Sequence, residues 1–106
     1  MNLLDFYNKI ASDSEDKSVR NAKFFSEEVT MYNILNGTFK DGDIEKIKMS
    51  PSIFSPVFDI TLNTETMAYN AEQNLDQQIV PGAYKPLYQL HITRKDKTIT
   101  VKLNEV

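Results

Sequence analysis

The sequence predicts an α+β fold in which two N-terminal helices pack on a small antiparallel sheet ending in a C-terminal β-hairpin. Apolar residues recur every three or four positions in the first third of the chain, which is typical of helices. They alternate with polar residues near the C-terminus, which is typical of half-buried strands. The 106 residues contain no internal repeat or Gly/Ser linker, so we expect a single domain, 1–106.

Two helices are expected before residue 37. A short first helix is indicated by five residues at helical spacing: Leu3, Leu4, Tyr7, Ile10 and Ala11. Ser12 and Glu15 form a capping-box pattern that predicts the start of the second helix.

The second helix shows a longer apolar stripe, and Asn36-Gly37 is expected to end it with a left-handed residue. Its expected core face, at spacings of three and four, is Val19, Ala22, Phe25, Val29, Tyr32 and Leu35, widened by Phe24, Met31 and Ile34. Glu27 and Glu28 are expected to lie off this face.

The segment from Thr38 to Met49 allows two interpretations. Asp41-Gly42 favours a hairpin turn between residues 38–40 and 43–49, whereas a short helix over residues 43–48 suits the Glu, Lys and Ile residues there. Pro51 and Pro56 bracket an extended or irregular segment, because the residue before each proline is disfavoured in a helix.

A strand, a helix and a turn are expected next. The alternation of residues 58–62 predicts a half-buried strand. Thr64 is placed to cap a helix that runs to Asp76, with Met67, Ala68, Ala71 and Leu75 on one side. Pro81-Gly82 predicts a type II turn with a positive φ at the glycine.

The C-terminal hairpin is the clearest β signal. A turn centred on Lys95-Asp96 would place every apolar residue on one face. The expected cross-strand pairs are Ile92 with Ile99, Leu90 with Val101, Tyr88 with Leu103 and His91 with Thr100.

Composition excludes several classes of protein. There is no cysteine, which rules out disulfides, thiolate chemistry and cysteine-ligated zinc. The N-terminus lacks a signal-peptide pattern, and no apolar run approaches the roughly 20 residues of a membrane helix. We therefore expect a protein of the cytoplasm that has no membrane contact.

No catalytic or metal site is expected, and no cofactor. The phosphate-binding, dinucleotide-binding, hydrolase and zinc-protease motifs are all missing. Asp41, Asp43 and Glu45 begin like a calcium loop, but Lys46 stands where that loop needs glycine. His91, the single histidine, falls on the polar face of the hairpin, where a surface role is expected rather than general-base chemistry.

The net charge of −3 argues against direct nucleic-acid binding. One local exception is the C-terminal segment 85–106, which has a net charge of +3 and contains Lys85, Arg94, Lys95, Lys97 and Lys102. Lysines on a hairpin also discourage edge-to-edge strand pairing, and this explanation is the simpler one.

Residues 49–84 contain no lysine or arginine, and this is the most unusual feature of the sequence. The stretch carries four acids among Phe54, Phe58, Met67, Tyr69 and Tyr84. An acidic, aromatic surface suits a partner with a basic cleft, and its expected contact residues are Asp59, Glu65, Tyr69, Glu72 and Asp76. The alternative is a run of core and neutral loop residues.

The chain resembles the small acidic anti-CRISPR proteins that phages and mobile elements use to inhibit Cas9. The resemblance rests on length, on ten lysines against two arginines, on nine asparagines, and on the acidic stretch. It implies a non-enzymatic inhibitor, in a bacterial host cell, of a basic nucleic-acid-handling enzyme such as a Cas9-type nuclease or of its guide-RNA loading. The alternatives are an immunity protein against a nuclease toxin, a small enzyme and a nucleic-acid-binding module.

Overall fold

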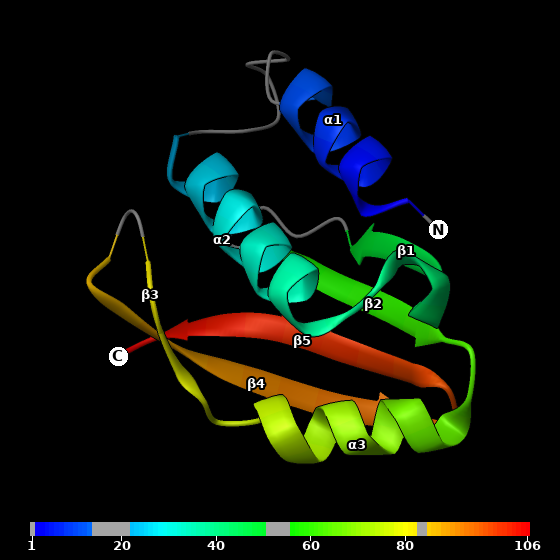
Figure 1. The fold of residues 1–106 in the computed structure, drawn as a ribbon. Helices are drawn as coiled ribbons and strands as arrows, with labels where there is room; N and C mark the ends of the chain where they lie inside the picture. Colours follow the sequence, from blue (N-terminus) through cyan, green and yellow to red (C-terminus); the bar gives the residue numbers. More distant parts are fainter. Residues whose placement is uncertain (1, 14–21, 51–55, 83–84) are drawn as a thin grey trace.

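The expected α+β class is confirmed. The computed structural model describes residues 2–13, 22–50, 56–82 and 85–106, and these form three α-helices and one five-stranded antiparallel sheet (Figure 1). The strand order is β1-β2-β5-β4-β3. The elements are α1 (Leu3–Asp13), α2 (Ala22–Thr38), the 3-10 turn η1 (Asp41–Asp43), β1 (Ile44–Ser50), β2 (Val57–Leu62), α3 (Glu65–Leu75), β3 (Ile79–Pro81), β4 (Leu87–Lys95) and β5 (Thr98–Glu105).

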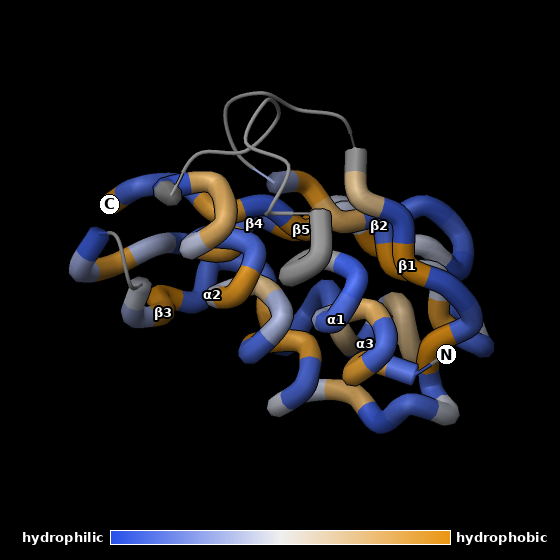
Figure 2. Tube along the Cα trace, turned by 90° about the horizontal axis from the view of Figure 1, so that it is seen from above, coloured by the Kyte–Doolittle hydropathy of each residue, from blue (hydrophilic) through white to orange (hydrophobic). Residues whose placement is uncertain are grey.

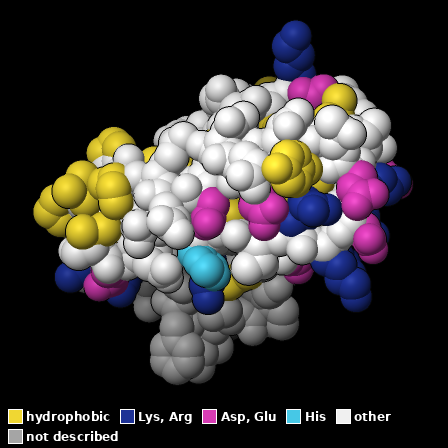
Figure 3. Space-filling view, turned by 90° about the horizontal axis from the view of Figure 1, so that it is seen from below, with side chains coloured by type: hydrophobic (Ala, Val, Ile, Leu, Met, Phe, Trp, Pro, Cys, Tyr) yellow, Lys and Arg dark blue, Asp and Glu magenta, His cyan; other side chains and the backbone are white. Residues whose placement is uncertain are grey.

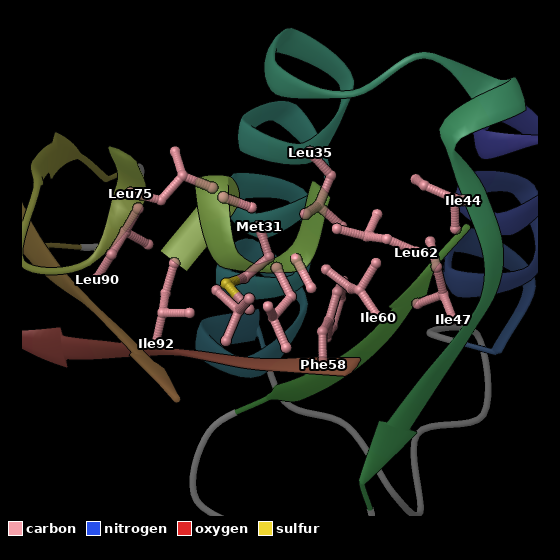
Figure 4. Close-up of a cluster of buried hydrophobic side chains, with 14 of the residues drawn as sticks. Met31, Leu35, Ile44, Ile47, Phe58, Ile60, Leu62, Leu75, Leu90 and Ile92 are labelled. Atoms are coloured by element: carbon pink, nitrogen blue, oxygen red, sulfur yellow. The ribbon is translucent and has the colours of Figure 1, made fainter. Parts of the chain in front are cut away.

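All three helices lie on the same side of the sheet (Figure 2). The apolar residues of α1, α2 and α3 meet those of the strands in one core, part of which is drawn in Figure 4. Phe58, Ile60 and Leu62 of β2 lie at its centre, each with no exposed surface. The opposite face of the sheet is covered by no helix among the described residues, and we call it the open face.

Helix α1 begins after Asn2, whose side chain accepts hydrogen bonds from the N–H groups of Leu4 and Asp5 at 2.9 and 3.2 Å. Leu3 and Phe6 are buried, whereas Leu4, expected on the apolar side, is 58% exposed. Ser12, expected to cap the second helix, lies within α1, whereas Glu15, Val19, Pro51, Phe54 and Tyr84 lie outside the described residues.

The core face of α2 differs from the expected one. Phe24, Met31 and Leu35 are buried, while Phe25, Val29 and Tyr32 are half-buried. Apolar residues extend around most of this helix, so their spacing does not define one stripe. The Tyr32 ring packs against the ring of Tyr7 in α1, with 4.7 Å between the two ring centroids. Part of the expected stripe therefore faces α1 rather than the sheet.

The expected end of α2 is also wrong. The helix continues through Asn36 and Gly37 to Thr38, and the N–H of Phe39 donates to the carbonyl of Leu35 at 2.9 Å. Gly37 does not adopt a positive φ. Glycine permits the left-handed conformation but does not require it, and here the helical bonds prevail.

Of the two interpretations of residues 38–49, the strand over 43–49 is confirmed as β1, but the hairpin and the helix are both wrong. Residues 43–48 are not helical, and the strand that begins at Ile44 pairs with β2 rather than with residues 38–40. A register shift between Ile44 and Lys46 interrupts the alternation of β1. Because the partner strand lies beyond Pro56, local spacing could not identify it.

The expected strand and helix between residues 57 and 76 are confirmed. The Thr64 hydroxyl accepts a hydrogen bond from the N–H of Met67 at 3.1 Å, as a cap should. Ala68, Ala71 and Leu75 are buried, but Met67 is 37% exposed.

Pro81-Gly82 is not a type II turn. Pro81 ends β3, and Gly82 does not adopt a positive φ. The structure gives the glycine another purpose, because a Cβ at residue 82 would lie 2.1 Å from Cε2 of Tyr88. The glycine thus lets the backbone lie against the buried tyrosine ring.

The faces of the β4–β5 hairpin are as expected, but its register is shifted by two residues. Leu90 pairs with Leu103, Ile92 with Val101 and His91 with Lys102. A two-residue shift keeps every side chain on its face, so burial does not distinguish the two registers. The turn falls at Asp96-Lys97, where Asp96 takes a φ of 54°.

Within the described residues, no helix is both long and apolar enough to cross a membrane.

Candidate functional site

Three of the five expected contact residues lie together on α3. Glu65, Tyr69 and Glu72 are spaced four and three residues apart and follow one side of the helix, which faces Arg94 of β4. A carboxylate oxygen of Glu65 lies 3.5 Å from Nη1 of Arg94, and one of Glu72 lies 3.5 Å from Nε. The guanidinium also lies over the Tyr69 ring, 5.6 Å from its centroid. Arg94 therefore partly neutralises this acidic side of α3.

Asp76 is engaged in the fold. Its Oδ1 accepts a hydrogen bond from the N–H of Ile92 at 2.8 Å, just past the point where the pairing of β3 with β4 ends. The side chain satisfies a donor at the edge of the sheet that would otherwise need another partner. Asp76 is therefore a structural residue as well as an acid of the stretch.

Asp59 lies on the open face, away from α3. Its neighbours Phe58 and Ile60 point into the core, so its own side chain projects from the other side of β2. The Thr100 hydroxyl donates to Oδ1 of Asp59 at 2.7 Å. The acidic stretch thus does not form a single surface.

Sequence reasoning missed the neighbourhood on the other side of α3. Met67, Asn70 and Asn74 line a shallow hollow of about 200 Å³ between α3 and the end of α2. Its other walls are Phe39 and Asp43, together with Thr38 and Ala71. We call the exposed residues Glu65, Met67, Tyr69 and Asn70, with the half-buried Glu72 and Arg94, the α3 surface. Figure 3, seen from below, shows acidic, basic and hydrophobic side chains close together on this side.

A group of buried polar side chains joins α2 to the hairpin. Glu27, 2% exposed, lies near the Tyr88 hydroxyl, yet its Oε1 and that hydroxyl have no hydrogen-bond partner of regular geometry among the described residues. Burial raises the pKa of Glu27, and Lys23 opposes the shift. Burial, reinforced by the Glu27 carboxylate, also raises the pKa of Tyr88. Glu28 is buried as well, so neither glutamate lies off the core face as the sequence predicted.

The same group ends at the surface in an ion pair. Nζ of Lys23 lies 2.6 Å from Glu105, which Lys85 also approaches at 3.8 Å. The hydrogen bond raises the pKa of Lys23 and lowers that of Glu105. Glu27 and Tyr88 are 2% and 0% exposed, so neither side chain is open to a substrate in this fold. We assign them to the fold rather than to catalysis.

Metal-ligating side chains are not gathered in the described part of the chain, where no group of three or more His, Asp or Glu residues could hold an ion. His91 is exposed on the open face and pairs in register with Lys102.

Exposed apolar side chains gather near β3, at the left of Figure 3: Ile79, Leu87 and Val106 are 50%, 45% and 75% exposed. Pro81 has no N–H to offer at this edge, which weakens it as a template for an added strand.

Comparisons with protein-family models, curated proteins and solved structures found no match to this chain.

Proposed function

We propose that the protein is a non-enzymatic binding domain that blocks a basic, nucleic-acid-handling enzyme through its α3 surface. The supporting observation is that Tyr69, 50% exposed, lies on the same side of α3 as the carboxylates of Glu65 and Glu72, and that Met67, 37% exposed, lines the hollow on the other side of the helix. Aromatic residues and methionine are enriched in protein interfaces, and exposed carboxylates steer a basic partner toward them. Asp59 and Asp76 are left out of the proposed contact because of their positions in the fold.

The ion pair between Arg94 and Glu65 can be exchanged for one with a partner. Its contacts with Glu65 and Glu72 are 3.5 Å long, and Glu65 is exposed. Exposed pairs of this kind contribute little to stability, about 0–1 kcal/mol. A partner's arginine or lysine can therefore replace Arg94 as the counter-ion of Glu65 at small energetic cost.

The first partner to test is a Cas9-type nuclease, with and without its guide RNA. Tyr69→Ala should weaken binding about tenfold or more, as truncation of an interface anchor does. Glu65→Lys should slow association and reduce its dependence on salt. Asp5→Lys is the matched control, since Asp5 is also an exposed acid in the first turn of a helix but lies on α1.

Binding kinetics across a salt series, with circular dichroism to check folding, give the answer. If the nuclease binds neither the wild type nor the variants, with or without guide RNA, the proposed partner is wrong. If Asp5→Lys slows association as much as Glu65→Lys does, α3 is not the contact surface.

A further inference from the structure

The open face of the sheet collects lysines that are far apart in the sequence. Lys46 and Lys48 of β1 lie on the same face as Lys95 of β4 and Lys102 of β5, and all four are exposed. We call this region the basic sheet surface. It comprises these lysines with Asp59, Thr61, His91, Thr93, Thr98 and Thr100.

The strand register arranges these residues in rows across the sheet. In one row Lys46 lies opposite Thr61, Thr61 opposite Thr98 and Thr98 opposite Lys95. The Thr61 and Thr98 hydroxyls share a hydrogen bond of 3.0 Å, which fixes the centre of the row. With strands about 4.8 Å apart, the lysines at the two ends are roughly 14 Å apart at the backbone. A cation therefore stands on each side of a central strip of hydroxyls.

The charge of this surface is opposite to that of the chain. Four lysines against Asp59 give the basic sheet surface a net charge of +3, whereas the whole chain carries −3. The negative charge is therefore concentrated elsewhere, in part on α3. The net charge of the whole chain argued against a polyanionic ligand because it treats the charges as evenly mixed. The structure separates them, so one face can bind an anion although the chain is acidic.

The kinds of side chain indicate which anion would bind. Among the described residues, the basic sheet surface includes no Phe, Tyr or Trp, which are the usual anchors of a protein interface and the rings on which bases usually stack. It offers lysine ammonium groups, which act as point charges, and the exposed Thr93 hydroxyl, which can donate to a phosphate oxygen. The Thr100 hydroxyl donates to Asp59, and the pair Thr61 and Thr98 keeps one donor beyond its shared bond. A phosphodiester backbone carries one negative charge at each phosphate. Lysines spread over the surface can pair with successive phosphates without contacting a base.

We propose that the basic sheet surface binds the phosphate backbone of nucleic acid without regard to sequence. The site is distinct from the α3 surface and goes beyond the proposed function, because it assigns a second ligand to the opposite side of the molecule. An inhibitor built in this way contacts a nucleic-acid-handling enzyme on one side and its nucleic acid on the other.

Fluorescence anisotropy with labelled 20-nucleotide single strands of mixed and uniform sequence tests the proposal. Binding should weaken as salt rises and should be similar for all sequences. Lys48→Gln with Lys102→Gln should lower the slope of log K against log salt by about 1.4, since each phosphate contact contributes about 0.7 for single strands. Lys9→Gln with Lys40→Gln is the control, because both lysines are exposed outside this surface. It should leave the slope nearly unchanged.

Asp59→Asn provides a gain-of-function test. It removes the negative charge of Asp59 and keeps an oxygen that can accept from Thr100. Glu45, which lines the same hollow as Asp59, is paired with Lys97 at 3.3 Å. The variant should bind oligonucleotides a few-fold more tightly. Equal weakening by the two lysine pairs, or no tightening by Asp59→Asn, would overturn the proposal.

Two further arms separate this inference from its rivals. Binding of polyglutamate but not of oligonucleotides would show that the surface accepts an acidic protein instead, which also refutes the proposal. Tyr69→Ala should bind oligonucleotides as wild type does. The nuclease assay and the oligonucleotide assay therefore test the two surfaces separately, and a failure of the α3 proposal does not decide this one.

Discussion

An engineered disulfide distinguishes the observed β4–β5 register from the one that the sequence predicted. The chain has no native cysteine, so two introduced ones have no competitors. His91 lies opposite Lys102 in the structure, and the predicted register placed it opposite Thr100. Directly opposed residues have Cα atoms about 4.5–5.5 Å apart, within the range of a disulfide, whereas diagonal neighbours are about 7–8 Å apart.

The magnitude follows from the loop that the bond closes. Linking positions 91 and 102 closes about 12 residues, for which chain entropy gives a stabilisation of about 2.8 kcal/mol. For a domain of this size, that corresponds to a rise in melting temperature of roughly 10–20 °C. The reduced form of the same double variant serves as the reference.

The assay compares His91→Cys/Lys102→Cys with His91→Cys/Thr100→Cys. Under mild oxidation only the first should form an intramolecular disulfide, seen as loss of free thiol, and only the first should melt at a higher temperature when oxidised. If the second variant oxidises readily and gains stability while the first does not, the register described above is wrong.

Three further predictions concern Gly82, Gly37 and Glu27. Gly82→Ala should destabilise the fold by about 1–3 kcal/mol, because its Cβ would overlap the buried tyrosine ring. Gly37→Ala, whose Cβ meets nothing within 4 Å in α2, should instead stabilise it by about 0.4–1 kcal/mol; equal effects in denaturant melts would contradict this packing. The third prediction concerns Glu27, whose pKa is raised in the folded state, so that the folded protein binds the proton more tightly than the unfolded chain does. The free energy of unfolding of the wild type should therefore fall as pH rises from about 4.3 through the raised pKa. Glu27→Gln should lack that fall, and a stability difference from wild type that does not change with pH would refute the assignment.

The sequence predicted those elements that local chemistry specifies. Helix α3 begins at Thr64 because that hydroxyl caps it, and both cap and apolar spacing are visible in the sequence. The hairpin faces follow from alternation alone. What failed depends on distant neighbours. β1 needed β2 as its partner, Glu27 is buried by contacts with the hairpin, and Gly82 is required by Tyr88.

The candidate site was predicted in part for the same reason. Glu65, Tyr69 and Glu72 belong to one helix, so a single periodicity places them together. Asp59 is close to them in sequence but points from the other side of a strand. Lys46 and Lys48 reach the hairpin lysines only through the β1–β2–β5 pairing, which no local pattern shows.

Asp59 connects the two proposals, because sequence and structure assign it to opposite surfaces. As a member of the acidic stretch it would attract a basic partner, and its neutralisation would weaken that complex. In the fold it lies opposite Lys48 and next to Thr100, where its charge opposes an anionic ligand. Asp59→Asn should therefore leave nuclease binding unchanged and tighten oligonucleotide binding. If Asp59→Asn instead weakens nuclease binding and leaves oligonucleotide binding unchanged, Asp59 contacts the nuclease, and its assignment to the basic sheet surface is wrong.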